Sequence, residues 1–174
     1  MRLINLEDVT IETIKSFKDS FKYEKETIHG SHQLQQANDL HKWMKEIIRL
    51  KEKNYQQAVQ TSHFALITDD NVMIGISDVK HHLTSYLQKE GGHISYTISP
   101  NYQGQGFGTA LLKETLKEAQ KIGLTSIHLT VKETNEASQK IIEKNNGRKI
   151  REIKVNHYNV WHYQINIDYN NNIM

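Results

Sequence analysis

The stretch Ile98-Ser99-Pro100-Asn101-Tyr102-Gln103-Gly104-Gln105-Gly106-Phe107-Gly108-Thr109-Ala110 decides the fold of this chain. An apolar strand ends at the only proline of the sequence, and a glycine-rich turn follows it. Glycines at alternate positions remove Cβ atoms, so the backbone N–H groups of the turn can converge on an anion. The helix that begins inside the turn adds unpaired N–H groups and a partial positive charge. This strand–turn–helix arrangement predicts a pyrophosphate site.

Two other phosphate-binding loops are excluded by missing residues. A Walker loop ends in Gly-Lys-Ser or Gly-Lys-Thr, and neither tripeptide occurs in the sequence. A dinucleotide fingerprint that starts at Gly104 needs a glycine where Thr109 stands. The pattern that remains is Gln103-x-x-Gly106-x-Gly108 after a strand, and it resembles the acyl-CoA loop of the GNAT N-acetyltransferase superfamily. The alternative is a glycine-rich turn that binds nothing.

A second segment resembles another part of the same superfamily. The residues Asn135-Glu136-Ala137-Ser138, followed by the run Ile141 to Gly147, match a motif of the form Asn-x-x-Ala/Ser and apolar-Tyr-Glu-Lys-Asn-Gly-Phe. The resemblance places Asn135, and also Ser138, beside the pantetheine arm of the cofactor, although Asn135 is equally suited to cap a helix. The tyrosine of the motif, which protonates the leaving thiolate in the family, is replaced here by Ile142.

The sequence before the loop resembles a narrower group. The strand Gly91-Gly92-His93-Ile94-Ser95-Tyr96 and the upstream Lys80-His81-His82-Leu83 are similar to segments of bacterial predicted acetyltransferases. Together the resemblances cover about residues 63–167. They imply acetyl-CoA as co-substrate and a set of cofactor contacts on the strand and the loop. These contacts are Tyr96, Thr97, Ile98, Gln103, Gly104, Gln105, Gly106, Phe107, Gly108 and Thr109, with Asn135 and Ser138 from the second motif.

Composition limits the other classes of function. The chain has 174 residues, 37% of them hydrophobic and 24% charged, which is typical of one globular domain spanning residues 1–174. A net charge of +2 without a basic block gives no reason to expect nucleic acid as a partner. The absence of cysteine removes the thiol nucleophile. No apolar run reaches the roughly 20 residues of a membrane span, so we expect a soluble cytoplasmic protein that does not bind membranes. A homodimer is compatible with the sequence.

Apolar periodicity and turn residues predict the elements along the chain. We expect helices over 8–21, from a Ser31 cap to about Leu50, from the glycine loop to about Ile122, and over 135–145. Gly123 and Gly147 would stop the last two as left-handed caps. We expect strands over 3–6, 63–68, 72–79, 93–99, 127–131, 149–155 and 158–167, with a frayed tail at 170–172. This order indicates an α/β domain with a mixed sheet. It is similar to the order of the GNAT fold, and the resemblance implies a mostly antiparallel central sheet that is flanked by helices and splayed between strands four and five.

Three side chains are candidates for proton transfer. His93 lies on the strand before the cofactor contacts, and imidazole titrates in the useful range, so it is our first candidate for the general base. The alternative for His93 is a core histidine that holds the Gly91–Gly92 bend. His81 is the second candidate for the base. Tyr96 is a candidate donor to sulfur, with core packing as its alternative. The ten histidines show no metal-binding spacing, so we expect no metal.

These observations predict an acetyl-CoA-dependent N-acetyltransferase that transfers an acetyl group directly to an amine in a ternary complex. We expect the acceptor to be the primary amine of a small molecule, because the insertion 80–90 can cover the acceptor cleft. The alternatives are a peptide or protein N-acetyltransferase and, in another class, an acyl-CoA-binding module without catalysis. The isoleucine at position 142 is the main support for the last alternative.

Overall fold

The structure is a computed structural model that describes residues 1–21, 27–53 and 55–167. The order of its helices and strands is the predicted one. The strands are β1 (Arg2–Asn5), β2 (Thr61–Ile67), β3 (Met73–Lys80), β4 (Ile94–Ile98), β5 (Ser126–Lys132), β6 (Arg148–Val155) and β7 (Tyr158–Asn166). The helices are α1 (Ile11–Asp19), α2 (Leu40–Leu50), α3 (Phe107–Lys121) and α4 (Glu136–Lys144). The tail expected at 170–172 lies outside the described residues.

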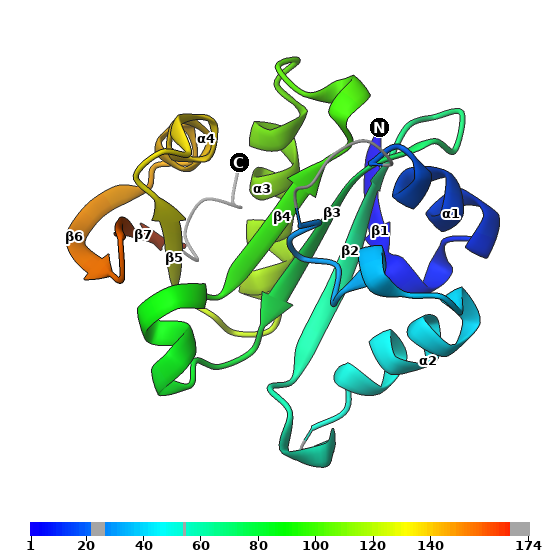
Figure 1. Ribbon diagram of the computed structural model, residues 1–174, viewed down its shortest axis with the longest axis horizontal. Coiled ribbons are helices and arrows are strands. Elements are labelled where there is room, and N and C mark those ends of the chain that lie inside the picture. Colours follow the sequence, from blue (N-terminus) through cyan, green and yellow to red (C-terminus); the bar gives the residue numbers. More distant parts are fainter. Residues whose placement is uncertain (22–26, 54, 168–174) are drawn as a thin grey trace, which may run out of the picture.

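The strands form two sheets, ordered β1-β2-β3-β4 and β5-β7-β6. Every ladder between the described strands is antiparallel, so the mixed part of the expected sheet does not appear in the strand pairing. Figure 1 shows β4 and β5 diverging where the two sheets meet. The α/β class and the splay between strands four and five are therefore confirmed.

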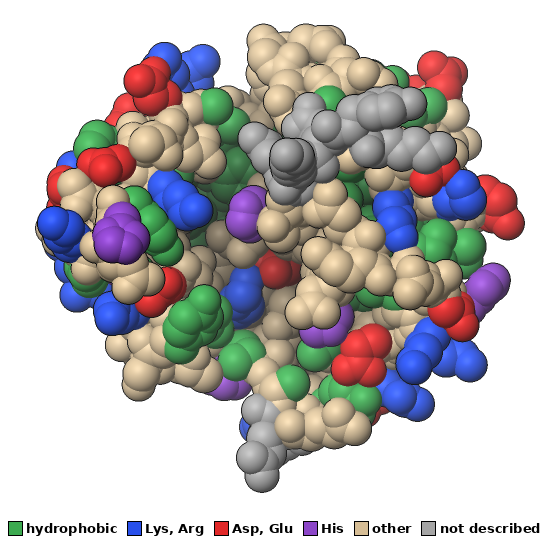
Figure 2. Space-filling view, viewed as in Figure 1, with side chains coloured by type: hydrophobic (Ala, Val, Ile, Leu, Met, Phe, Trp, Pro, Cys, Tyr) green, Lys and Arg blue, Asp and Glu red, His purple; other side chains and the backbone are tan. Residues whose placement is uncertain are grey.

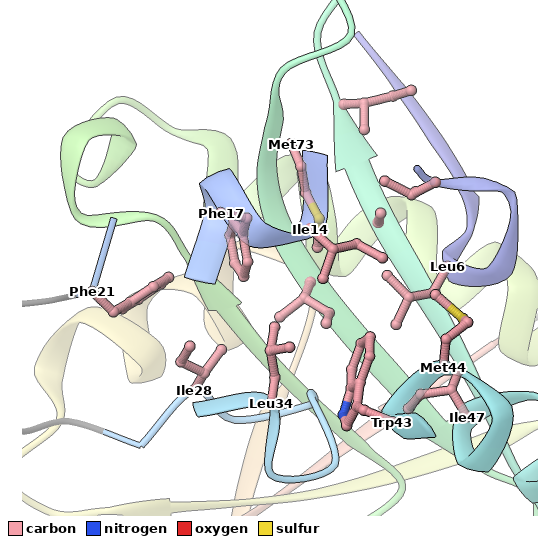
Figure 3. Close-up of a cluster of buried hydrophobic side chains, with 14 residues drawn as sticks. Leu6, Ile14, Phe17, Phe21, Ile28, Leu34, Trp43, Met44, Ile47 and Met73 are labelled. Carbon is pink, nitrogen blue, oxygen red and sulfur yellow. The ribbon is translucent and has the colours of Figure 1, made fainter. Parts of the chain in front are cut away.

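Helices cover both faces of the four-stranded sheet, which explains why all seven residues of β2 are buried. On one face Ala65 and Ile67 pack against residues of α1 and α2, including Phe17 and Ile47, in the cluster drawn in Figure 3. On the other face Leu66 packs against Leu111 of α3. A strand buried on both faces carries apolar residues without strict alternation.

A local clasp holds β4 to β5 at one end of the split. His93 N–H donates to the carbonyl of His128 at 2.7 Å, and Gly92 forms an isolated bridge with Leu129. Gly92 has a φ of +75°, and a Cβ there would lie 2.6 Å from the carbonyl oxygen of His128. Glycine is required at this position by both its backbone conformation and the close approach.

Two sequence-based boundaries were wrong. Ser31 does not begin the second helix: its hydroxyl accepts from Leu34 N in a short 3-10 turn, and α2 starts nine residues later with Asp39 as its N-cap. The helix expected to run to about Ile122 does so, because α3 ends at Lys121 and Ile122 is its C-cap, 40% exposed. The left-handed residue after α4 is Asn146 (φ +63°) rather than Gly147.

Candidate active site

The glycine loop presents its backbone amides without acceptors. Gly104 and Gly106 have φ values of +73° and +87°, and a Cβ on either would meet no atom within 4 Å. The first amide after the loop that has an acceptor is that of Ala110, which donates to Gly106 O at 3.2 Å. Within the described part of the chain, the amides from Gly104 to Thr109 donate to no acceptor. Open space and free donors at a helix start fit a pyrophosphate.

Side chains around the loop fix its shape. Gln103 folds back and donates from Nε2 to Ile98 O at 3.0 Å, which ties the loop to the end of β4. Gln105 donates to Asn101 O at 3.1 Å. Phe107 packs edge-on against Tyr102. The sequence-predicted loop residues therefore lie together at the end of β4, and no contact in the loop blocks an anion.

Gly108 has a packing role. A Cβ on this glycine would lie 2.5 Å from Cδ1 of Ile141, so its absence lets α3 approach α4. Asn145 donates from Nδ2 to Thr109 O at 3.2 Å and joins the end of α4 to the first turn of α3. The two helices that flank the split are thus fixed relative to each other.

Asn135 caps α4, as one of its two sequence interpretations required. Its Oδ1 accepts from Ser138 N at 3.1 Å, and the residue is exposed at the helix start. The cap occupies the side-chain oxygen, whereas no described residue accepts from the amide NH₂. Capping and a contact to a ligand are therefore compatible.

Tyr96 connects β4 to α4, the helix that follows β5. Its hydroxyl lies 2.7 Å from Ser138 Oγ. Burial raises the pKa of Tyr96 to about 12, so the phenol is protonated at neutral pH. An ordinary thiol has a pKa of about 8.5, so this phenol can donate a hydrogen bond to a thiolate without surrendering its proton.

Ile142 lies in the core. It is 1% exposed and belongs to the apolar cluster that includes Leu112 and Tyr163. Its Cγ2 lies 2.3 Å from the place where a Cβ of Gly147 would be. A larger side chain at position 142 would have to displace these neighbours, so the position is closed to the aromatic ring of the superfamily motif.

The two candidate histidines have structural partners. His93 Nδ1 accepts from the amide of His128 at 3.0 Å, which places the proton of the neutral ring on Nε2. Desolvation lowers the pKa of His93 to about 4. His81 Nε2 lies 2.9 Å from Ser62 Oγ, and burial also lowers its pKa. These contacts favour the alternative role of His93, a histidine that holds the bend between β4 and β5.

The face of β4 opposite Tyr96 carries Ser95 and Thr97. Thr97 donates from Oγ1 to His29 O at 2.9 Å, which fixes the segment before α2 over the strand. Ser95 is the register partner of Asp78 on β3, and Asp78 is the partner of His63 on β2. Because opposed residues share a face, these three side chains form a polar row across three strands.

This polar row reaches a cavity of about 340 Å³. Figure 2 shows the face hollowed near its centre, with acidic and basic side chains in the hollow. Neither His93 nor His81 contributes to the wall of the cavity. The wall is formed by His32, Leu50, Ala58, Val59, Thr61, His63, Asp78, Lys80, Thr84, Tyr86 and Leu87.

Sequence reasoning missed His63, Asp78 and Lys80. A signal was present, because Asp78 and Lys80 interrupt an apolar strand at a spacing of two and so share a face. A charged residue in a buried strand is expensive unless it is paired, and such residues are functional candidates.

Comparison with known proteins identifies the family. The model of the acetyltransferase (GNAT) family matches residues 26–147. The chain belongs to the GNAT acetyltransferase family. It is therefore an acyltransferase by family, with the fold that its sequence predicted. No curated protein sequence matches the chain.

Solved structures share this fold at low identity. A chimera of the spermidine N-acetyltransferase SpeG from Vibrio cholerae and hSSAT is 15% identical with a TM-score of 0.66, over 95% of this chain and 96% of that one. N-acetyltransferase PseH from Campylobacter jejuni, in complex with acetyl coenzyme A, is 16% identical with a TM-score of 0.63, over 95% and 97%. RimL, an α-N-acetyltransferase of a ribosomal protein in complex with coenzyme A, is 14% identical with a TM-score of 0.67, over 95% and 93%.

No helix among the described residues is long and apolar enough to cross a membrane. No group of three or more His, Cys, Asp or Glu side chains in the described ranges is placed to hold a metal ion.

Proposed function

We propose that the protein is an acetyl-CoA-dependent N-acetyltransferase that transfers the acetyl group directly to the primary amine of a small molecule in a ternary complex. The observation that carries this proposal is the run of free backbone amides from Gly104 to Thr109. These amides lie at the end of β4, the strand that diverges from β5 beyond the Gly92–Leu129 bridge. Family membership supports the same chemistry.

The residues of this chain divide the work. The loop amides bind the pyrophosphate, and the start of α3 adds favourable partial charge. Backbone groups of Tyr96, Thr97 and Ile98 face the split and align the pantetheine arm, with Asn135 and Ser138 on the opposite side. Bound acetyl-CoA supplies a thioester that is activated toward amines. The Tyr96 hydroxyl, protonated at neutral pH, donates a hydrogen bond to the departing sulfur.

The cofactor assignment is tested with a matched pair of glycine variants. Gly106→Asp places a negative side chain among the free amides, and Gly123→Asp makes the same change at the other end of α3. Both glycines have positive φ and open space around a Cβ, so the backbone strain is alike. We expect calorimetry to show at least a tenfold loss of CoA affinity, about 1.4 kcal/mol, for Gly106→Asp and none for Gly123→Asp. Equal affinity in both folded variants would reject the loop as the phosphate site.

An acyl-CoA-binding module without catalysis is the second candidate, because Ile142 provides no acid on α4. The two candidates separate in a thiol-release assay with acetyl-CoA and a panel of amino acids, polyamines, amino sugars and peptides. Acceptor-dependent release of CoA supports the enzyme. CoA binding without release for any acceptor supports the module. Release with peptides alone supports a peptide or protein N-acetyltransferase.

A further inference from the structure

The cavity beside the polar row contains a buried ion pair. Lys80 Nζ donates to both oxygens of Asp78, at 2.8 and 2.9 Å, and to Ser95 Oγ at 3.1 Å. The side chains of Asp78 and Lys80 are only 10% and 15% exposed. Both of them line the cavity. A pair buried this deeply is weak evidence for a stabilising role, because desolvation of the charges offsets their attraction.

Asp78 keeps one oxygen open to a ligand. Its Oδ1 accepts two hydrogen bonds, from Lys80 and from the amide of Ser95 at 2.9 Å. Its Oδ2 accepts only from Lys80 among the described residues. A carboxylate oxygen has two acceptor sites, so Oδ2 can receive an ammonium group from the cavity.

A second observation points to a ligand in the same place. His63 is 1% exposed and lines the cavity, and its Nδ1 has no hydrogen-bond partner among the described residues. Burial lowers the pKa of His63 to about 4, so the ring is neutral at neutral pH. A buried polar atom without a partner costs free energy, so this histidine does not serve stability alone at the cavity wall.

We propose that this cavity is the acceptor site and that it takes an α-amino acid with an apolar side chain, whose amine is held at Asp78 and whose carboxylate is held at Lys80, where it replaces Ser95 Oγ as the acceptor of one N–H. This inference rests on the proposed function.

The charges of the cavity favour a zwitterion over a polycation. Asp78 and Lys80 together carry no net charge, so a polyamine would meet one carboxylate and one repelling ammonium. A zwitterion presents one group to each partner, and opposite charges are paired when the ligand is bound. This pairing leaves no charge buried alone.

The remaining wall and the size fit the rest of an amino acid. Leu50, Ala58, Val59 and Leu87 provide apolar surface, and the volume of about 340 Å³ lies at the lower end of the range of roughly 300–1,000 Å³ for ligand pockets. Such a cavity holds one compact molecule rather than a folded protein surface.

The position of Asp78 links the cavity to the site of transfer. Its carboxylate accepts from Ser95 N, one residue before the β4 residues expected to align the thioester. An amine held at Asp78 therefore lies beside the strand that borders the split. The segment before α2, which contributes His32 to the cavity wall, is fixed by Trp43, whose Nε1 donates to Ser31 O and His32 O at 3.1 and 3.0 Å.

The test compares two acceptors that differ by one carboxylate, leucine and 3-methylbutylamine. For the wild type we expect kcat/KM to be at least about tenfold higher for leucine, mainly through KM. The double variant Asp78→Asn/Lys80→Met removes both charges without leaving one buried alone, and the amide oxygen that it introduces can still accept from Ser95 N. We expect it to lose the preference for leucine while its CoA affinity and melting temperature stay near the wild-type values. Glu114→Gln/Lys117→Met, which removes an exposed pair on α3, serves as the control and should keep the preference.

Leucine binding is also measured by calorimetry on the CoA-saturated protein, and we expect about tenfold weaker binding in the Asp78/Lys80 variant. The inference is overturned if 3-methylbutylamine or spermidine is the better acceptor, if only peptides react, or if the double variant keeps the preference for leucine. In these cases CoA binding and thiol release still stand, and so does acetyl transfer. If CoA itself does not bind, the proposed function fails, and the inference fails with it.

Discussion

Replacement of Asn135 separates the two roles that its position allows. Asn135→Ala removes the Oδ1 acceptor of Ser138 N, an exposed cap. The loss of a cap lowers the free energy of unfolding by about 1 kcal/mol, which lowers the melting temperature of a domain of this size by roughly 2–4 °C. If the free NH₂ group donates to the pantetheine arm, the same variant also loses about 0.5–1.5 kcal/mol of CoA binding, or roughly twofold to twelvefold in Kd.

Asn135→Ser is the matched control. Serine caps a helix about as well as asparagine, but its hydroxyl is already engaged by Ser138 N and does not replace the amide donor. We expect the serine variant to keep the wild-type melting temperature and to lose CoA affinity as the alanine variant does. Differential scanning calorimetry and titration calorimetry measure the two quantities. Wild-type CoA affinity in both variants would show that Asn135 is only a cap and would refute its place in the cofactor site.

Three further outcomes follow from burial and hydrogen bonding. Ile142→Tyr should lower the free energy of unfolding by about 1–3 kcal/mol, because the larger side chain overpacks the core, and it should not raise kcat. Urea titration measures the stability, and the thiol-release assay measures kcat. A variant that is faster and equally stable would contradict this expectation. His93→Ala should change kcat less than about tenfold and keep the acidic limb of the pH–rate profile, whereas loss of that limb with a 10²–10⁴-fold lower kcat would restore His93 as the base. Burial holds the pKa of His63, His93 and His162 at about 4 in the folded state, below the ordinary 6.5. The unfolded chain therefore binds more protons, and the free energy of unfolding should fall as pH drops from about 6.5 to about 4; a flat profile in urea titrations would refute the assignment.

The order of elements could be predicted because local signals agreed with the tertiary structure. The Asp69-Asp70-Asn71 turn, the stop at Gly123 and the Asn156-His157 turn all lie at element ends in the structure. The start of α2 was missed because apolar residues continue at helical spacing from Leu34. Tertiary contacts decide this region instead: the Trp43 indole holds the carbonyls of Ser31 and His32, and Gln33 takes a left-handed conformation.

The site was predictable where it depends on the backbone and not where it depends on distant contacts. Alternating glycines before a helix encode the free amides directly, and the structure retains them. The partner of His93 lies 35 residues away on β5. The Asp78–Lys80 pair becomes part of a cavity only when the end of α2 and the segment 84–87 fold over it. No local sequence pattern predicts which face of β3 will be covered by these two segments.

The structure also suggests why the tyrosine of the superfamily motif is dispensable here. Ile142 packs into the core under Gly147, so a hydroxyl on α4 has no route to the split from that position. Tyr96 contacts the same helix from β4, and its hydroxyl meets Ser138 within the first turn of α4. The phenol is thus anchored across the split by one hydrogen bond, and its burial keeps it protonated. We infer that β4 supplies the hydrogen-bond donor that α4 lacks. Because a phenol of this pKa stabilises a thiolate without protonating it, the proton that the attacking amine loses passes through solvent and protonates CoA after transfer.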